Sequence, residues 1–203
     1  MPLRSDTSGK ITLELRSTLP DDSGMVIDNL RLIPGELPPL PESPTIANAS
    51  FETPVSTHFG DNPHLFGHQL PGWLVLRENV DVISFDRFGA PHGKAVVDFG
   101  GHGAGGIGQI ITDLEPGARY RLSLKYAQHT YWDQQDPLTA EIYLNGELAL
   151  TLARNKSQKA PVWESSSCQV TIPADGRLRL EMYSTALEVG GGVLFDDLKL
   201  VKL

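Results

Sequence analysis

The pattern of apolar and polar positions along this chain repeats every second residue. Ten runs alternate in this way or are rich in β-branched residues: KITLELRS, MVIDNLRLI, WLVLRENVDVISF, KAVVDFG, GIGQIITDL, RYRLSLKYAQ, TAEIYLNGELALTLA, SSCQVTIP, RLRLEMYS and VLFDDLKLVKL. A period of two places successive side chains on opposite faces of a strand. No segment carries the 3.6-residue period of a helix of three turns. The pattern predicts an all-β protein, most simply a sandwich of two antiparallel sheets.

Turn-forming residues separate the predicted strands. Asn145-Gly146 stands between AEIYL and ELALTL, which is typical of a two-residue hairpin turn. Further turns are expected at Glu115–Gly117 and Ala174–Gly176. The 20 glycines and 15 prolines of the chain support many turns and argue against a helical fold.

The first part of the chain resembles its last part. GKITLELRSTLPDDSGMVIDNLRL, from Gly9, aligns with GRLRLEMYSTALEVGGGVLFDDLKL, from Gly176, and Asp28 then matches Asp196. Residues 1–33 are therefore predicted to be the C-terminal hairpin of a preceding copy of the same module. The Pro-rich residues 34–44 are predicted to be a semi-rigid linker, and residues 45–203 to be the complete domain. A lone hairpin is marginally stable, so neighbouring copies of the module are expected partners.

Charge and length exclude several classes of partner. The 203-residue chain has a formal net charge of −8, which disfavours nucleic acid and anionic membrane. No apolar run approaches the length that spans a bilayer. Met1-Pro2-Leu3-Arg4 does not lead into a signal-peptide core, so an extracellular or cell-surface location requires a signal outside this sequence.

Cysteine and histidine usage gives little support for metal or nucleotide chemistry. Cys168 is the only cysteine, so no internal disulfide is possible, and a buried structural thiol is predicted. His58, His64 and His68 share one loop, but no cysteine or helix accompanies them, so a zinc site is not favoured. The Gly-rich segment around His102 leads into a strand and not into a helix, which argues against a phosphate-binding loop.

Five motifs from residue 45 onward occur in an order that resembles a known family. They are ANASFETP, LPGW, APHGKAVVDFG, GIGQIITDLEPGARYRLSLKYA and the final VLFDDLKL. This order is similar to that of the galactose-binding-domain-like jelly roll of carbohydrate-binding modules from xylan- and glucan-degrading enzymes. Plant cell-wall proteins and bacterial exosortase-sorted surface proteins of this fold are similar too. The resemblance implies two facing antiparallel sheets and a protein that binds glycans without cleaving them.

A structural calcium ion is a second implication. Period-two geometry places Asp196 on one face with Leu194, Leu198 and Leu200, hence on the core side. Neighbouring first and last strands would bring Glu52 close to Asp196, and two inward carboxylates favour a hard cation. In the resembling family the Glu of the FE motif, the first Asp of the DD pair and the carbonyl before the Phe bind calcium. The alternative is that both carboxylates accept backbone hydrogen bonds at strand ends.

The matching positions here are Ser50, Glu52 and Asp196. The family often adds an acidic residue in its Pro-x-Gly loop, whereas this chain has His92 there. Main-chain oxygens near Lys94, or Asp86, are the expected substitutes.

The segment AQHTYWDQQDP is the candidate glycan site. It joins two strong strands and brings aromatic rings together with amide and carboxylate groups, the combination that stacks on sugars and binds their hydroxyls. The predicted ligand-binding residues are His129, Tyr131, Trp132, Asp133 and Gln134. The alternative is that the rings only seal the rim of the sandwich.

Other aromatic positions are expected to be structural. Trp73 and Trp163 stand where the resembling family places core or edge-packing tryptophans. Xylan-binding relatives carry an aromatic residue in the segment matching 100–108, and this chain has none. Binding at the loop rim is therefore preferred over binding in the groove.

Three functional hypotheses follow. The first is a non-catalytic, calcium-stabilised module that binds a polysaccharide or oligosaccharide in an extracellular multidomain protein. The second is a structural or adhesive repeat that binds no sugar. The third is a jelly-roll polysaccharide lyase or glycosidase, for which His129, Tyr131 and Arg154 are available. A non-enzyme is predicted.

Overall fold

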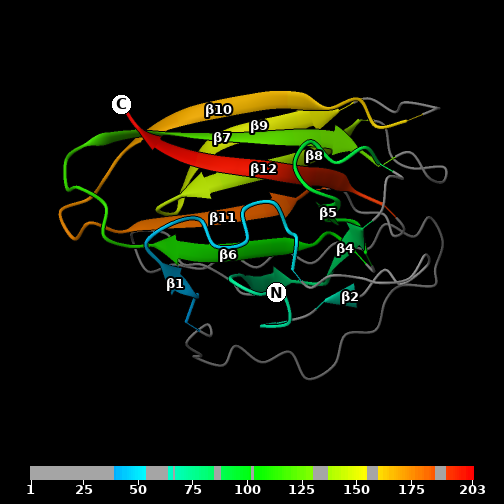
Figure 1. Ribbon diagram of the computed structural model, residues 1–203, viewed down its shortest axis with the longest axis horizontal. Coiled ribbons are helices and arrows are strands. Elements are labelled where there is room, and N and C mark those ends of the chain that lie inside the picture. The colour runs from blue at the N-terminus through cyan, green and yellow to red at the C-terminus, as the bar shows by residue number, and fades with distance from the viewer. Residues whose placement is uncertain are drawn as a thin grey trace, which may run out of the picture. The chain divides into compact units, whose positions relative to one another are not determined.

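The computed structural model describes residues 39–53, 64–65, 67–84, 88–101, 103–129, 137–154, 160–185 and 191–203. All the elements in these ranges are β-strands, arranged in two sheets (Figure 1). The all-β sandwich predicted from the alternating pattern is confirmed. Among the described residues there is no helix that is long and apolar enough to cross a membrane. The predicted hairpin in residues 1–33 lies outside the described residues.

Sheet A has six strands in the order β1-β6-β11-β8-β9, and β3 also pairs with β6. All its pairs are antiparallel except β1 with β6. Its strands are β1 (Glu42–Ser43), β3 (Leu74–Arg77), β6 (Gly106–Ile111), β8 (Leu138–Leu144), β9 (Glu147–Arg154) and β11 (Leu178–Ser184).

Sheet B has six antiparallel strands in the order β10-β7-β12-β5-β4-β2. The last strand, β12, lies between β7 and β5, in the middle of the sheet (Figure 1). The strands of sheet B are β2 (His64–Leu65), β4 (Val80–Ser84), β5 (Ala95–Asp98), β7 (Arg119–Gln128), β10 (Glu164–Thr171) and β12 (Val193–Lys202).

The main core fills the space between the inner faces of the two sheets. Its largest fully buried side chains include Trp73, Phe51, Phe99 and Phe195. Trp73 stacks on Phe51 with ring centroids 5.8 Å apart. The prediction that Trp73 is a core residue is confirmed. Cys168 is half-buried against this core, and burial raises the pKa of its thiol, as expected for a structural cysteine.

The compact unit that contains the sandwich begins at Leu40, earlier than the predicted domain start at residue 45. Leu40 is buried, and Glu42–Ser43 pairs with the end of β6. The Ile110 amide donates a hydrogen bond to the Pro41 carbonyl at 2.8 Å. The end of the Pro-rich segment is thus part of sheet A, because the carbonyls of Pro41 and Ser43 accept hydrogen bonds from the amides of Ile110 and Thr112.

A smaller apolar cluster covers part of the outer face of sheet B. Alternation along the strands sends one set of residues to this face while their neighbours enter the main core. Trp163 packs against this outer cluster, and its indole Nε1 donates to the Phe88 carbonyl at 2.8 Å. Trp163 is therefore an edge-packing residue. The members of the cluster are Ile83, Phe88, Val96, Ala127 and Leu194.

A β-bulge places Asp196 and Leu198 on opposite faces of β12. The register of β12 against β7 shifts between Asp196 and Lys199, and Asp197 has a left-handed backbone with φ 52°. Phe195 and Leu198 both point into the main core, whereas Leu194 lies in the outer cluster. The prediction that Asp196 shares a core-facing side with Leu198 is wrong, because strict period two fails across the bulge.

Candidate functional site

Glu52 and Asp196 meet the same loop, residues 91–95, from two distant parts of the chain. The amides of Lys94 and Ala95 both donate to Glu52 Oε1 at 3.0 Å. The amide of His92 donates to Asp196 Oδ2 at 2.7 Å. Each carboxylate thus contacts this loop, and the predicted closeness of Glu52 to Asp196 stays a prediction. The hydrogen-bonded arrangement considered as an alternative to calcium is also present.

Asp196 is fully buried, although it lies on the outer face of sheet B. Its Oδ1 accepts a second backbone hydrogen bond from Asp197 at 2.6 Å. Burial raises the pKa of Asp196 to about 7, against the opposing effect of these hydrogen bonds. An ionised carboxylate here is costly unless a positive charge lies beside it.

Gly93 allows the loop to approach Glu52. A Cβ atom at Gly93 would lie 2.3 Å from Glu52 Oε1, and the Gly93 backbone is left-handed with φ 70°. A glycine at this position of the Pro-x-Gly loop is thus required for the amides of Lys94 and Ala95 to reach the Glu52 carboxylate. Ser50 is half-buried in the turn that precedes Phe51, and the Lys94 side chain is exposed.

The oxygen-rich character of this locus fits a hard cation. The carboxylates of Glu52 and Asp196 retain lone pairs beyond those used by the loop amides. The described residues contain no group of three or more His, Cys, Asp or Glu side chains placed to hold a metal. Main-chain carbonyls would therefore have to complete any coordination sphere.

The predicted rim site is described only at His129. Tyr131, Trp132, Asp133 and Gln134 lie outside the described residues. The side chain of His129 is buried, with its ring centroid 4.8 Å from that of Phe88. His129 Nε2 is 3.9 Å from Asp98 Oδ2. His129, which follows the end of β7, thus lies beside a buried polar cluster that includes Asp98.

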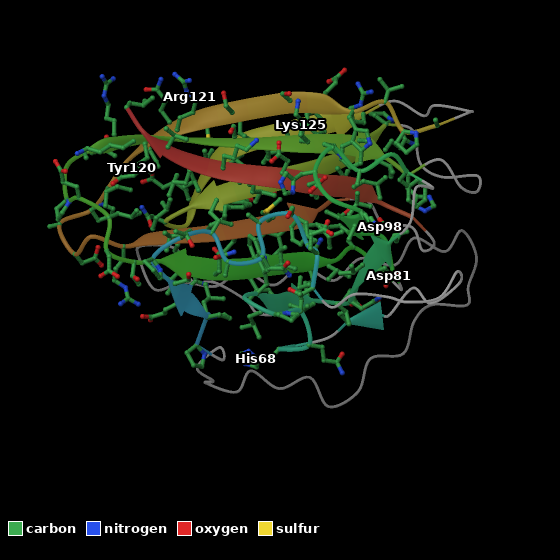
Figure 2. The ribbon with its side chains drawn as sticks, viewed as in Figure 1. His68, Asp81, Asp98, Tyr120, Arg121 and Lys125 are labelled. Atoms are coloured by element: carbon green, nitrogen blue, oxygen red, sulfur yellow. The ribbon has the colours of Figure 1, made fainter. Side chains whose placement is uncertain are left out.

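That cluster lies where β4 and β5 are paired (Figure 2). Asp81 and Asp98 are opposite each other in the register, and Asn79 Nδ2 donates to Asp81 Oδ1 at 2.9 Å. Asp98 Oδ1 accepts the amides of Gly100 and Gly192, at 2.9 and 2.7 Å. Burial, with the nearby Asp81 carboxylate second, raises the pKa of Asp98 to about 7. The cluster joins the end of β5 to the start of β12.

A second candidate site, which the sequence analysis missed, is the outer face of sheet A. We call it the tyrosine face. Tyr143 of β8 and Tyr183 of β11 contact edge to face, with ring centroids 5.9 Å apart. Each ring is opposite the other strand's glutamate in the register. Both rings are half-buried, so part of each contacts solvent. The face comprises Tyr143, Tyr183, Glu141, Glu181 and Arg179.

Hydrogen bonds order the polar groups of the tyrosine face. The Tyr143 hydroxyl donates to Glu141 Oε2 at 2.7 Å, and the Tyr183 hydroxyl donates to Glu181 Oε1 at 3.1 Å. Arg179 Nη2 lies 2.8 Å from the same Glu181 oxygen. Glu181 is fully buried, whereas the Arg179 side chain is 35 % exposed, so the ion pair is shielded from water only on the carboxylate side.

Arg77 and Gly106 position the Tyr183 ring. The Arg77 guanidinium lies 5.6 Å from the ring centroid and donates to the carbonyls of Ala104 and Ser184. A Cβ atom at Gly106 would lie 2.3 Å from Tyr183 Cδ1, so the ring occupies the space above this glycine. The ring therefore has one packed orientation before any ligand arrives.

Alternation along the strands indicates part of the composition of the tyrosine face. In LTAEIYL it places Glu141 and Tyr143 on one face, and in RLRLEMYS it groups Arg179, Glu181 and Tyr183. The sequence did not indicate that β8 and β11, which are 33 residues apart between Leu144 and Leu178, would be neighbours. Strand pairing over such a separation depends on the whole fold.

Neither a protein-family model nor a curated protein sequence matches the chain. Solved structures do match it. A cyclase from Fischerella sp. TAU is 17% identical with a TM-score of 0.55, over 78% of this chain and 95% of the cyclase. TmCBM61, solved in complex with β-1,4-galactotriose, is 14% identical with a TM-score of 0.53, over 78% of this chain and 99% of the module.

These likenesses show the fold. The chain has the jelly-roll sandwich of galactose-binding-like carbohydrate-binding modules, as the order of sequence motifs predicted. The cyclase has a similar fold, so the fold by itself does not separate a binding module from an enzyme.

Proposed function

We propose that this chain is a non-catalytic carbohydrate-binding module whose glycan lies on the tyrosine face. The observation that carries the proposal is the contact of Tyr143 with Tyr183, flanked by two glutamates and an arginine. Aromatic rings stack on the C–H faces of sugars, while carboxylate and guanidinium groups bind hydroxyls. TmCBM61, a module of similar fold, was solved with β-1,4-galactotriose, so a neutral oligosaccharide is the first ligand to test.

Preorganisation supports binding at this face. The Tyr183 ring is held by Arg77 and Gly106, and Glu181 is held by Arg179. Side chains already fixed lose little conformational entropy when a ligand binds. The rim residues His129, Tyr131, Trp132, Asp133 and Gln134 stay a second predicted glycan site, and the experiment below separates the two.

The affinity of the chain for β-1,4-galactotriose and for soluble xylan and glucan should be measured by titration calorimetry. Tyr143→Ala and Tyr183→Ala should each weaken binding about ten- to hundredfold, the loss of one aromatic anchor. Tyr183→Phe keeps the ring and should lose less. Arg121→Ala, on sheet B, is the matched control and should leave affinity unchanged.

Trp132→Ala tests the rim site. If this variant alone abolishes binding while both tyrosine variants bind as the parent does, the glycan lies at the rim. If the folded parent binds no glycan in a broad panel of plant, algal and bacterial sugars, the chain is a structural or adhesive repeat and the proposal fails.

Non-catalytic action is part of this proposal. The tyrosine face is an outer sheet surface, on which Glu181 is held by its ion pair with Arg179. Because a cyclase has a similar fold, the bound glycans should also be analysed for shortened or rearranged products. Any turnover that survives rigorous purification would overturn the non-enzyme prediction.

We further propose that the locus of Glu52 and Asp196 holds a structural calcium ion. The proposed ligands are carboxylate oxygens of Glu52 and Asp196 and main-chain carbonyl oxygens of Ser50 and Lys94. A bound cation would neutralise the buried Asp196 carboxylate, whose pKa is raised by desolvation. The ion would connect the start of the domain to β12.

The proposed setting is extracellular or at the cell surface, where polysaccharides are the ligands of such modules. Residues 1–33 are proposed to derive from a preceding copy of the module, with neighbouring copies as partners. The similarity between the segments that start at Gly9 and Gly176 supports this arrangement.

A further inference from the structure

A row of cations follows the outer face of β7. Arg119, Arg121 and Lys125 all occupy odd-numbered positions of this strand, while Leu122 and Leu124 enter the core between them. Arg119 and Arg121 are exposed and Lys125 is half-buried. Arg121 and Lys125 are labelled along this strand in Figure 2. At about 3.4 Å per residue, the row is roughly 20 Å long.

These three cations have no carboxylate partner among the described residues. The other exposed or half-exposed cations of the sandwich mostly do have one. The ion pairs are Arg154 with Glu164, Arg177 with Glu42, Arg179 with Glu181, Lys199 with Asp197, and Lys202 with Glu115. An acidic chain that pairs its cations elsewhere thus leaves one strand with unneutralised positive charge.

On the β10 side, uncharged hydrogen-bonding groups lie across from the row, whereas on the β12 side Val201 is opposite Arg121 and Asp196 is opposite Lys125. In the register of β10 against β7, Thr171 is opposite Arg119, Gln169 is opposite Arg121 and Ser165 is opposite Lys125. Lys125 Nζ donates to Ser165 Oγ at 2.7 Å. A sheet optimised for stability alone would place opposite charges at these cross-strand positions. Cations beside hydroxyl and amide groups instead match the anionic groups and hydroxyls of an acidic sugar chain.

We propose that this surface binds a stretch of acidic polysaccharide through its carboxylate or sulfate groups. We call it the β7 strip: Arg119, Arg121 and Lys125 with Thr171, Gln169 and Ser165. The strip is elongated along β7, and arginine forms bidentate hydrogen bonds with planar anions. It is on the outer face of sheet B, whereas the tyrosine face is on the outer face of sheet A, so the two sites are separate.

Charge favours an acidic glycan over the other polyanions. A protein of net charge −8 repels any polyanion, and it repels nucleic acid, which has a charge on every phosphate, more strongly than a polymer with one charge per sugar ring. Recognition of anionic membranes usually requires clusters of four to eight basic residues. Three cations spread along one strand suit a polymer whose charges are spaced by sugar rings.

Affinity electrophoresis in polygalacturonate and in heparin, with neutral galactan as the reference, tests this proposal at low salt. The parent should be retarded by at least one acidic polymer, and the retardation should fall as salt rises. Arg119→Gln/Arg121→Gln should weaken that binding at least tenfold. Arg177→Gln/Lys202→Gln removes the same charge from paired cations and should change it less than twofold. Thermal melts verify that both variants are folded.

Three results would overturn the proposal. They are a parent that binds neither acidic polymer, equal losses in the two double variants, and tighter binding of duplex DNA or of phosphatidylserine vesicles than of either glycan. The test is independent of the tyrosine face. Tyr183→Ala should keep its binding to the acidic polymer, and Arg119→Gln/Arg121→Gln should keep its binding to neutral oligosaccharide.

Discussion

At the scale of single residues, the position of Gly93 decides whether Glu52 can reach its loop. Gly89 and Gly93 both have left-handed backbones, with φ 57° and 70°. A Cβ atom at Gly89 would meet no heavy atom within 4 Å, whereas at Gly93 it would overlap the Glu52 carboxylate. The two glycines are thus a matched pair, in which only one adds a steric conflict to the backbone strain.

Gly93→Ala should destabilise the fold by at least about 1 kcal/mol more than Gly89→Ala. Alanine has roughly the same left-handed strain at both sites, but only at Gly93 does its Cβ atom also overlap the Glu52 carboxylate. Urea denaturation of the two variants measures this difference.

Calcium at a hundredfold excess over its dissociation constant should raise the parent's stability by about 2.7 kcal/mol. The shift should persist in Gly89→Ala and vanish in Gly93→Ala, Glu52→Gln and Asp196→Asn. Thermal melts in calcium and in EDTA measure it. Identical melts of the parent under both conditions would contradict the calcium proposal.

At the scale of elements, the bulge in β12 sets the register of the central strand of sheet B. Asp197, with φ 52°, lies in the bulge, where β12 has one residue more than β7. Leu198 therefore faces the main core instead of the outer face. Asp196 precedes the bulge and stays on the outer face with Leu194, against the loop amide of His92. The bulge therefore allows Leu198 to enter the core although Asp196, two residues earlier, faces the candidate cation site.

Asp197→Val should destabilise the protein by about 1–3 kcal/mol, since a β-branched residue is strained in the left-handed region. Asp197→Gly relieves the strain and should stay within about 1 kcal/mol of the parent. Lys199→Ala removes only the 2.8 Å ion pair with Asp197, which is worth about 0–1 kcal/mol. Urea denaturation compares all three. A valine variant as stable as the glycine variant would show that the bulge does not need this conformation.

At the scale of the whole molecule, buried acids make global stability depend on pH. Asp98 has its pKa raised to about 7, well above the value of 3.8 for an exposed Asp. Between these values the folded state holds a proton that the unfolded state has released. The free energy of unfolding should therefore be highest near pH 4 and fall as the pH rises toward 7, by about 4 kcal/mol at most.

Asp98→Asn should flatten this fall, because its side chain keeps the oxygen that accepts the amides of Gly100 and Gly192 but never ionises. Relative to the parent, the variant should gain stability steadily between pH 4 and pH 7. Asp175→Asn, at an exposed turn, is the control and should follow the parent's curve. Denaturation midpoints across this range provide the measurement. Parallel curves for Asp98→Asn and the parent would mean that Asp98 does not titrate in this window.

The local chemistry of the chain determined its elements. The alternation in RYRLSLKYAQ, the Asn145-Gly146 turn and the buried position of Trp73 all follow from interactions between residues close in sequence or from apolar burial alone. In the structure Asn145 and Gly146 have φ of 53° and 83°, as a tight hairpin turn requires. The same alternation of apolar and polar residues predicted the sandwich.

Contacts between distant strands required the tertiary structure. Tyr143 and Tyr183 form one surface only because β8 and β11 are paired in a particular register, and register is a property of the whole sheet. The core position of Leu198 depended on a bulge that period-two reasoning does not predict, and the burial of His129 depended on Phe88 packing over it. Sequence periodicity specifies which side chains share a strand face. Only the assembled sheets decide which strand faces meet.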